Sequence, residues 1–230
     1  MYKTELHCHS AEISACSRAD AATVARRYAE AGYTTLVLTN HFAPFTYNHL
    51  GCTDWQGWIT RFMDGYHLLR EVAPPELTVL FGAEIRLDDN PNDFLLPGVT
   101  EEFLRAHPFL WEMRIEDLYP LARENGIFVV QAHPFRNHMR ITPPDWLDAI
   151  EIFNGSAGGH YGTDSRNDVA AFWASKHGMA VTSGTDFHYP EDTINGGICT
   201  EAPIRSTKEL VRVLRSGSYR PIIDRKIDGE

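Results

Sequence analysis

Histidines and carboxylates follow short apolar segments at several places along this chain. The side chains concerned are His7, His9, His41, Glu84, His133, Asp186 and His188. Imidazoles and carboxylates bind divalent transition metals, and they are costly to bury without a partner. The pattern therefore predicts a centre that holds metal ions.

Two closely spaced pairs carry most of this signal. His7 and His9 are separated by one residue, so in an extended strand both side chains point to the same face, with their Cα atoms about 7 Å apart. Asp186 and His188 repeat the spacing near the other end of the chain. A single histidine at the end of a strand is usually structural, whereas two such pairs together with Glu84 favour metal binding.

The elements that would position these groups alternate between strand and helix. Apolar, β-branched segments predict strands at 34–39, 77–82, 127–131, 149–153 and 179–183. Helical patterns lie at 20–31, 55–73, 116–125, 165–177 and 208–215. Residues 86–114 are rich in Asn, Asp and Pro and are predicted to be a loop over one end of the sheet.

This alternation indicates an α/β protein with a parallel sheet. About seven strand–helix units follow one another without a Pro/Gly/Ser linker, which predicts a single domain over residues 1–230. We expect a distorted barrel of seven mostly parallel strands, and an open doubly wound sheet is the alternative. In a parallel barrel the C-terminal ends of the strands meet at one rim, where the metal-binding side chains would converge.

Composition and charge exclude several classes of protein. The chain has 230 residues with 21 Lys+Arg and 31 Asp+Glu, a net charge of −10, which argues against a nucleic-acid partner. It contains no apolar run of membrane-spanning length, and its N-terminus lacks the hydrophobic stretch of a signal peptide. Four widely spaced cysteines give no disulfide framework. We therefore expect a cytoplasmic enzyme with a small-molecule substrate, and we make no prediction of its oligomeric state.

Six short motifs, in order, resemble those of the PHP superfamily, named for its polymerase and histidinol-phosphatase members. They are Glu5–Ser10, Leu38–His41, Gly82–Glu84, Gln131–Pro134, Glu151–Gly155 and Ser183–His188, and they span nearly the whole chain. The resemblance implies a distorted seven-stranded β/α barrel, two or three divalent metal ions at the C-terminal rim, and hydrolysis of a phosphate ester. Imidazole-rich ligation favours zinc, iron or manganese.

The resemblance also implies how the ligands are shared. His7, His9, Glu84 and Asp186 would hold one metal. His41 and His188 would hold a second, and Glu84 would bridge toward His133 on a third. Asn154 matches a position near the site in that family.

Three departures from the family pattern affect the metal count. Asn40 replaces the usual Asp before His41. No clear counterpart of a further third-metal histidine exists in residues 92–98, which leaves both two and three ions open. The second metal's remaining ligand is expected five to seven residues after His9, where Ser14, Ala15 and Cys16 stand. The alternatives for this position are the Cys16 thiolate, water, and Glu12.

The predicted reaction is hydrolysis of a small-molecule phosphate ester, as a phosphatase or phosphodiesterase, by metal-activated hydroxide. Arg18 and Arg136 could clamp the phosphate, and Asn154 and His160 lie where they could contact substrate. One alternative is a metal-dependent amide or ester hydrolase of the amidohydrolase type, although Glu84 occupies the place of that type's bridging lysine. The others are a noncatalytic metal-binding module and, as a weaker version of phosphoesterase activity, an exonuclease.

Overall fold

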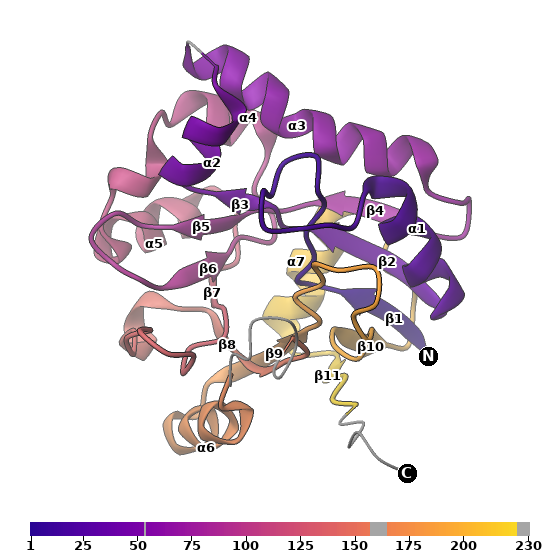
Figure 1. The fold of residues 1–230 in the computed structure, drawn as a ribbon. Helices are drawn as coiled ribbons and strands as arrows, with labels where there is room; N and C mark the ends of the chain where they lie inside the picture. The colour runs from indigo at the N-terminus through magenta and orange to yellow at the C-terminus, as the bar shows by residue number, and fades with distance from the viewer. Residues whose placement is uncertain (53, 157–164, 225–230) are drawn as a thin grey trace.

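The computed structural model describes residues 1–52, 54–156 and 165–224, which form a mixed α/β fold (Figure 1). Its strands are β1 (Tyr2–Glu5), β2 (Tyr33–Leu38), β3 (His41–Phe42), β4 (Thr78–Phe81), β5 (Glu84–Arg86), β6 (Asp93–Leu95), β7 (Val130–Gln131), β8 (Ala149–Asn154), β9 (Ala180–Gly184), β10 (Ile198–Thr200) and β11 (Arg220–Pro221). Its helices are α1 (Ala21–Glu30), α2 (Pro44–Leu50), α3 (Trp55–Val72), α4 (Glu101–Ala106), α5 (Ile115–Glu124), α6 (Asn167–His177) and α7 (Thr207–Ser216), with 3-10 turns η1 (Leu110–Glu112) and η2 (Pro144–Trp146).

The strands form two adjoining sheets. The first has the order β11-β10-β1-β2-β4 and the second the order β3-β5-β6-β7-β8-β9. Two residues separate β2 from β3, and two residues separate β4 from β5. The Glu84 N–H donates to the Asn40 carbonyl, which links the start of β5 to the connection between β2 and β3. An isolated parallel bridge between Cys8 and Phe187 joins the chain beyond β1 to the chain beyond β9. Segments following strands of both sheets therefore meet in one region.

The α/β class predicted from the sequence is confirmed. Strand pairs β1–β2, β2–β4, β3–β5, β7–β8 and β8–β9 are parallel, whereas the pairs made by β6 and β10 are antiparallel. Within the described residues the hydrogen-bonded ladders define two sheets and do not close into one barrel.

The prediction of an irregular loop over residues 86–114 is wrong. This segment contains the end of β5, strand β6, helix α4 and the turn η1. Asp93 of β6 pairs with Arg86 of β5 in the ladder, and their side chains form a two-pronged ion pair with N···O distances of 2.7 and 2.6 Å. A polar cross-strand pair of this kind stabilises a short strand that lacks the apolar pattern expected of one.

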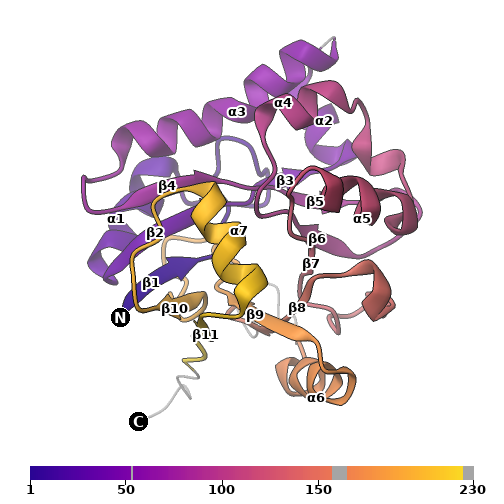
Figure 2. The ribbon, with the colours of Figure 1, turned by 180° about the vertical axis from the view of Figure 1, so that it is seen from behind.

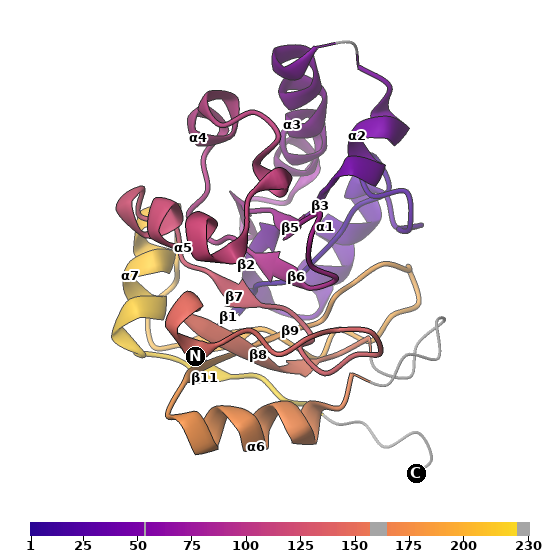
Figure 3. The same ribbon diagram turned by 90° about the vertical axis from the view of Figure 1, so that its left-hand side faces the viewer.

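Helices cover the outer faces of both sheets. Helix α7 crosses the first sheet (Figure 2) and buries Leu210 and Leu214 in a core shared with Leu6 and Val37. Helix α6 runs along β8 and β9 (Figure 3). Helix α1 begins as predicted, because Asp20 accepts the N–H of Thr23 at 2.8 Å. No helix in the described part of the chain has the length and apolarity needed to cross a membrane.

Strand β1 ends at Glu5 because the Glu5 carboxylate takes the next two backbone donors. Its Oε1 accepts the N–H groups of Leu6 and His7, each at 2.9 Å, which removes these donors from the sheet ladder. The same carboxylate accepts the Thr185 N–H at 3.0 Å and the Tyr28 hydroxyl at 2.9 Å. One buried side chain thus ties the segment after β1 to the segment after β9.

Candidate metal centre

The seven side chains predicted as metal ligands come together at the ends of strands from both sheets. We call His7, His9, His41, Glu84, His133, Asp186 and His188 the central cluster. His7 and His9 follow β1, His133 follows β7, and Asp186 and His188 follow β9, while His41 and Glu84 open β3 and β5. All are buried except His41, whose side chain is 13% exposed.

Glu84 lies at the centre of the cluster, and each of its carboxylate oxygens faces two imidazoles. Oε1 is 3.2 Å from His7 Nε2 and 3.2 Å from His133 Nε2. Oε2 is 3.3 Å from His9 Nε2 and 2.7 Å from His41 Nδ1. A carboxylate placed this way can share its two oxygens between different metal ions.

The two oxygens of Asp186 have separate surroundings. Oδ1 faces into the cluster, 3.2 Å from His7 Nε2 and 3.3 Å from His9 Nε2. Oδ2 accepts hydrogen bonds from Arg136 at 2.8 Å and from the Asn154 amide at 3.2 Å. Arg136 and Asn154 therefore orient Asp186 so that one oxygen remains directed at the imidazoles.

Several buried polar atoms of the cluster lack a hydrogen bond of acceptable geometry among the described residues. They are His7 Nε2, His9 Nε2, His41 Nδ1, Glu84 Oε2 and His133 Nδ1. Unpaired buried polar atoms are rare because each costs about 1–3 kcal/mol. Two ligand atoms that each lie about 2.0–2.2 Å from one ion are themselves about 3 Å apart, which matches the separations around Glu84 and Asp186. The residues present therefore fit metal ions.

Ligand atoms of the central cluster and of Asp93 form four overlapping groups of three residues. Within each group the three atoms lie within 4.8 Å of one another. The groups are His7–His9–Asp186, His9–His41–His188, His7–Glu84–His133 and His41–Glu84–Asp93. The first three combine only predicted residues. Asp93 in the fourth was not predicted, because it lies in the segment predicted to be a loop over one end of the sheet.

The protonation of the carboxylates suits metal binding. Burial disfavours the charged form of Glu84, but His41 and His7 beside it hold the pKa of this carboxyl well below its usual range. Burial likewise opposes ionisation of Asp186, and the positive charges of His7 and its other neighbours hold its pKa well below normal. Both groups are therefore ionised, as metal ligands must be.

Hydrogen bonds also fix the tautomers of the imidazoles. His7 Nδ1–H donates to Glu151 Oε1 at 3.0 Å, so Nε2, which faces Glu84 and Asp186, is the nitrogen on which a metal would replace the proton. His188 Nδ1–H donates to the Asp186 carbonyl at 2.9 Å. His9 Nδ1 lies 3.3 Å from the Ser14 hydroxyl, and burial together with two neighbouring imidazoles lowers the pKa of His9 well below its usual value. A neutral His9 can act as a ligand through Nε2.

Glu151 is a supporting residue that the sequence analysis did not single out, although it lies in one of the quoted motifs. Besides His7, it accepts the backbone N–H of His133 at 2.8 Å and the Asn154 amide at 3.0 Å. In the sequence, its role was indicated only by its place as a carboxylate within an apolar strand, shortly before Asn154. Its partners lie far away in sequence, so its role could not be read from local spacing.

Glu151→Gln is expected to lower metal affinity about 10–100-fold, because the acceptor that orients His7 loses its charge. Competition with a fluorescent chelator measures the change. Glu124→Gln, an exposed charge change at the end of α5, is the control and should bind metal as the unmodified protein does. Unaltered affinity in the Glu151 variant would mean that His7 does not depend on this contact.

The backbone is strained at two residues of the cluster. His133 and Asp186 have φ values of 27° and 55°, in the left-handed region that non-glycine residues seldom occupy. Such residues cost about 1–3 kcal/mol each and persist where the surrounding structure holds them. Gly184, before Asp186, permits the close approach, since a Cβ there would lie 2.4 Å from His7 Cβ and 2.6 Å from Glu151 Oε1.

Asn40, the first departure from the family pattern, supports the loop after His9. Its Oδ1 accepts the Ser10 N–H at 2.8 Å and the Ser14 hydroxyl at 2.9 Å, and Ser14 in turn accepts the His41 N–H at 3.2 Å. An amide oxygen performs this role as a carboxylate would. The bonds bring the loop that carries Cys16 over the cluster.

Cys16 contacts both imidazoles expected at the second metal. Burial would raise the pKa of its thiol, but hydrogen bonds to His188 and His41 lower it to about 6. Ser14 is taken up by the bonds just described, and Glu12 accepts the Ala21 N–H at 2.9 Å. Of the alternatives raised for this position within the protein, Cys16 is the one beside His41 and His188.

The four residues predicted to contact substrate have different positions. Arg136 and Asn154 bind Asp186, as described above. The Arg18 guanidinium donates to the carbonyls of Ala15 at 2.9 Å and Ser17 at 3.0 Å, within its own loop. His160 lies outside the described residues.

At the level of sequence, the chain matches no known family profile and no curated protein. Its fold resembles solved structures of low sequence identity. One is a two-domain protein from Bacteroides vulgatus that contains a predicted PHP-like metal-dependent phosphoesterase, with a TM-score of 0.62 and 15% identity over 96% of this chain. This chain spans 64% of that protein's length.

Two further structures share the fold over most of both chains. PsfC from Pseudomonas syringae has a TM-score of 0.66 and 15% identity, covering 98% of this chain and 92% of PsfC. An amidohydrolase from Chromobacterium violaceum with bound sulfate has a TM-score of 0.51 and 16% identity, covering 92% and 96% of the two chains. The resemblance seen in the sequence thus extends to three dimensions: the chain has the fold of PHP-like metal-dependent phosphoesterases.

Proposed function

We propose that this protein is a metal-dependent phosphoesterase that hydrolyses small-molecule phosphate esters at the central cluster, within one domain over residues 1–230. The observation that carries the proposal is the set of buried imidazole nitrogens about 3 Å from the Glu84 carboxylate, of which His7 Nε2 and His9 Nε2 have no hydrogen bond of acceptable geometry among the described residues. The fold shared with a predicted PHP-like phosphoesterase supports the reaction class. We further propose that the two sheets, although no continuous ladder of the described strands joins them, together form a distorted barrel whose rim carries the site, since segments of both sheets meet there.

The proposed ligands divide as the resemblance implies. His7, His9, Glu84 and Asp186 would hold one ion, and His41 and His188 a second. Glu84 and His133 would hold a third ion, and Asp93 could supply a further oxygen ligand, because Asp93 Oδ2 lies 3.8 Å from His133 Nε2. The imidazole-rich set favours zinc, iron or manganese.

When bound, such ions would supply a nucleophile from water at neutral pH and offset the charge of the phosphate oxygens. The chain's own residues prepare the site for this. Glu151 keeps the His7 proton on Nδ1, and Arg136 holds Asp186 in place. Four buried carboxylates, those of Glu84, Asp93, Glu151 and Asp186, are available to balance the charge of bound metal ions.

The proposal is tested by metal analysis of the purified protein together with phosphate-release assays on sugar phosphates, amino-alcohol phosphates and nucleotides. We expect at least about two transition-metal ions per chain. Phosphate release should stop on chelation and return with added metal. A chain that binds no metal on reconstitution would overturn the proposal. Metal-dependent cleavage of amides or carboxylic esters without phosphate release would instead support the amidohydrolase alternative, whose fold this chain shares.

We also propose that Cys16 is the remaining protein ligand of the second ion, on the basis of its contacts with His41 and His188. A thiolate binds zinc at about 2.3 Å and prefers soft ions. Cys16→Ser is therefore expected to lower occupancy of this site and to shift its preference toward harder ions. Titration with zinc, cobalt and manganese measures both effects.

A cobalt-loaded sample gives a readout that does not depend on activity. If Cys16 binds the ion, the near-ultraviolet thiolate-to-cobalt charge-transfer band is present in the unmodified protein and absent in Cys16→Ser. Cys52→Ser, at a cysteine whose thiol lies 3.8 Å from the Leu50 carbonyl, is the matched control and keeps the band. An unchanged spectrum and unchanged metal preference in Cys16→Ser would leave water as the ligand.

A further inference from the structure

A cleft of about 830 Å³ opens beside the central cluster, and neither the metal ligands nor the proposed reaction accounts for it. Three segments line it: residues 44–48 at the start of α2, residues 86–91 from the end of β5 onward, and residues 138–140 after β7. Its volume is that of a site for a small organic molecule, which is about 300–1,000 Å³.

The walls of the cleft touch the metal-binding side chains from outside. The Phe45 ring packs edge-on against the His41 ring, with centroids 5.4 Å apart. Arg86 is two residues after Glu84 on β5, so both side chains leave the same face of the strand. The Arg86 guanidinium binds Asp93 and lies 5.7 Å from the centre of the Phe45 ring. A phosphate ester at the metals would thus have the cleft next to it.

The cleft is preformed. Buried Asn92 fixes the backbone of Arg140 from both sides, accepting its N–H at 2.7 Å and donating to its carbonyl at 2.6 Å. Gln131 of β7 donates to the same carbonyl at 2.8 Å. His138 is held in the left-handed region, with φ of 71°, a conformation seldom adopted without a structural or functional reason.

Side chains that can donate hydrogen bonds to an anion come from two of the three walls. Arg86 lies on one, and His138 and Arg140 lie on another. The exposed residues Asp88 and Asp89 also line the cleft, and the Asp89 carboxylate is 3.9 Å from Arg114. Arg86 is committed to Asp93, which leaves Arg140 and His138 as the donors for an incoming anion.

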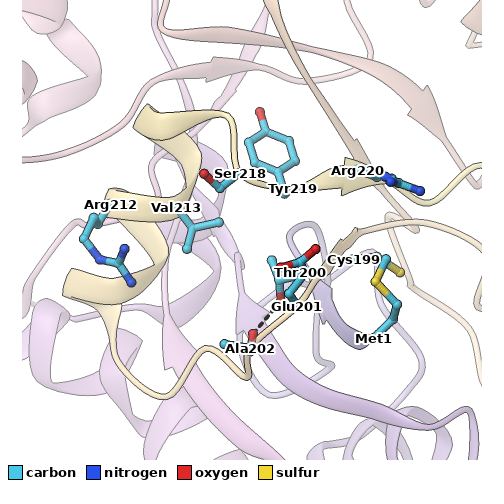
Figure 4. A pocket seen from close by; sticks show the side chains of 10 residues that line it. All are labelled: Met1, Cys199, Thr200, Glu201, Ala202, Arg212, Val213, Ser218, Tyr219 and Arg220. Carbon is cyan, nitrogen blue, oxygen red and sulfur yellow. Dashed lines mark hydrogen bonds between the residues drawn. The ribbon is translucent and has the colours of Figure 1, made fainter.

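A second hollow, of about 460 Å³, is lined by Met1 and by residues of α7, β10 and β11 (Figure 4). Met1 precedes β1, whereas the metal-binding histidines follow it, and no residue of the central cluster lines this hollow. It cannot receive the remainder of a molecule whose phosphate is at the metals.

We propose that the cleft is the specificity subsite of the phosphoesterase and binds a second oxyanion of the substrate, a phosphate or a carboxylate, through Arg140 and His138. The inference rests on the proposed function, since it places the scissile phosphate at the central cluster. The substrate class is then a small phosphate ester that carries a further anionic group.

The test is calorimetric binding of alkyl phosphonates, which are not hydrolysed, to the metal-loaded protein. Monophosphonates are compared with bisphosphonates and phosphonocarboxylates that have three- to six-carbon chains. A charged hydrogen-bonded contact corresponds to an affinity gain of about tenfold or more. We expect at least one dianionic series to bind that much more tightly than its monophosphonate, and the better series identifies the second group as phosphate or carboxylate.

Arg140→Gln should abolish the preference while the metal content is retained, since the contacts of Arg140 with Asn92 and Gln131 involve only its backbone. His138→Asn keeps a residue tolerated at positive φ and should reduce the preference. Arg70→Gln, at an exposed arginine of α3, makes the same charge change outside the cleft and should retain it.

Equal affinity for mono- and dianionic ligands, or a preference that survives Arg140→Gln, would overturn the inference. Tighter binding of aminoalkyl phosphonates than of the bisphosphonates and phosphonocarboxylates would also overturn it. That result would indicate that Asp88 and Asp89 bind the second group of the substrate instead. Failure of the proposed function would give a different result. In that case the protein would hydrolyse no phosphate ester, whether or not it bound the phosphonates.

Discussion

Glu84→Gln is expected to remove metal from more than one site and to lower turnover of a phosphate ester by about a thousandfold or more. The reason is the position of the two carboxylate oxygens, one between His7 and His133 and the other between His9 and His41. The amide keeps the shape of the side chain but removes its negative charge and replaces one oxygen ligand by an NH₂ group. Metal content per chain and kcat/KM measure the two effects.

A comparison with His41→Ala separates a shared ligand from a local one. That variant should mainly empty the site of His41 and His188 and leave the ions bound by His7 and its neighbours. Glu76→Gln, an exposed charge change before β4, should alter neither metal content nor turnover. Full occupancy and full turnover in Glu84→Gln would show that Glu84 does not bridge the ions.

Glu5→Ala is expected to destabilise the protein by about 3–5 kcal/mol, because each buried donor left without an acceptor costs about 1–3 kcal/mol. Glu5 is fully buried and accepts the N–H groups of Leu6, His7 and Thr185 and the Tyr28 hydroxyl. The substitution leaves these donors in the interior without an acceptor. Urea unfolding of the metal-free protein measures the loss, so that changes in metal binding do not contribute.

Tyr28→Phe provides the comparison for Glu5→Ala. It removes one of the hydroxyls that donate to Glu5 and leaves the backbone bonds in place, so we expect a cost of about 1 kcal/mol. A loss of stability in Glu5→Ala no larger than that in Tyr28→Phe would contradict the assigned role. Metal affinity of the Glu5 variant should also fall, because the backbone of His7 is released.

The residue types of the central cluster and most of their positions were predictable because they depend on local spacing. His7 and His9 are separated by one residue, as are Asp186 and His188, and a pair with this spacing shares a face where the backbone is extended. At Asp186 the backbone is instead left-handed, with φ of 55°, so the spacing alone does not place the side chains of that pair. Each pair also follows an apolar segment, and the ends of strands are where functional side chains gather. The helices at 20–31 and 55–73 were predictable for the same reason, since capping residues and apolar period are local.

The supporting residues were not predictable from spacing. Glu151 orients His7 across 144 positions of sequence, and Asp93 reaches the cluster because β6 pairs with β5 and β7. Asp93 lies in a segment whose Asn, Asp and Pro content is typical of a loop. Cross-strand pairing and the ion pair with Arg86 stabilise a strand there in spite of its weak local preference.

The sequence by itself determined that this is an α/β protein with a histidine- and carboxylate-rich candidate metal centre, because strand–helix alternation and residue spacing are properties of neighbouring residues. Only the tertiary structure decided that the strands form two sheets and that Glu84 faces four imidazoles. It also decided that Cys16 contacts His41 and His188, and that Arg136 donates to Asp186. The physical reason is register. A pairing between distant strands fixes which side chains meet, and that pairing is set by the packing of the whole chain.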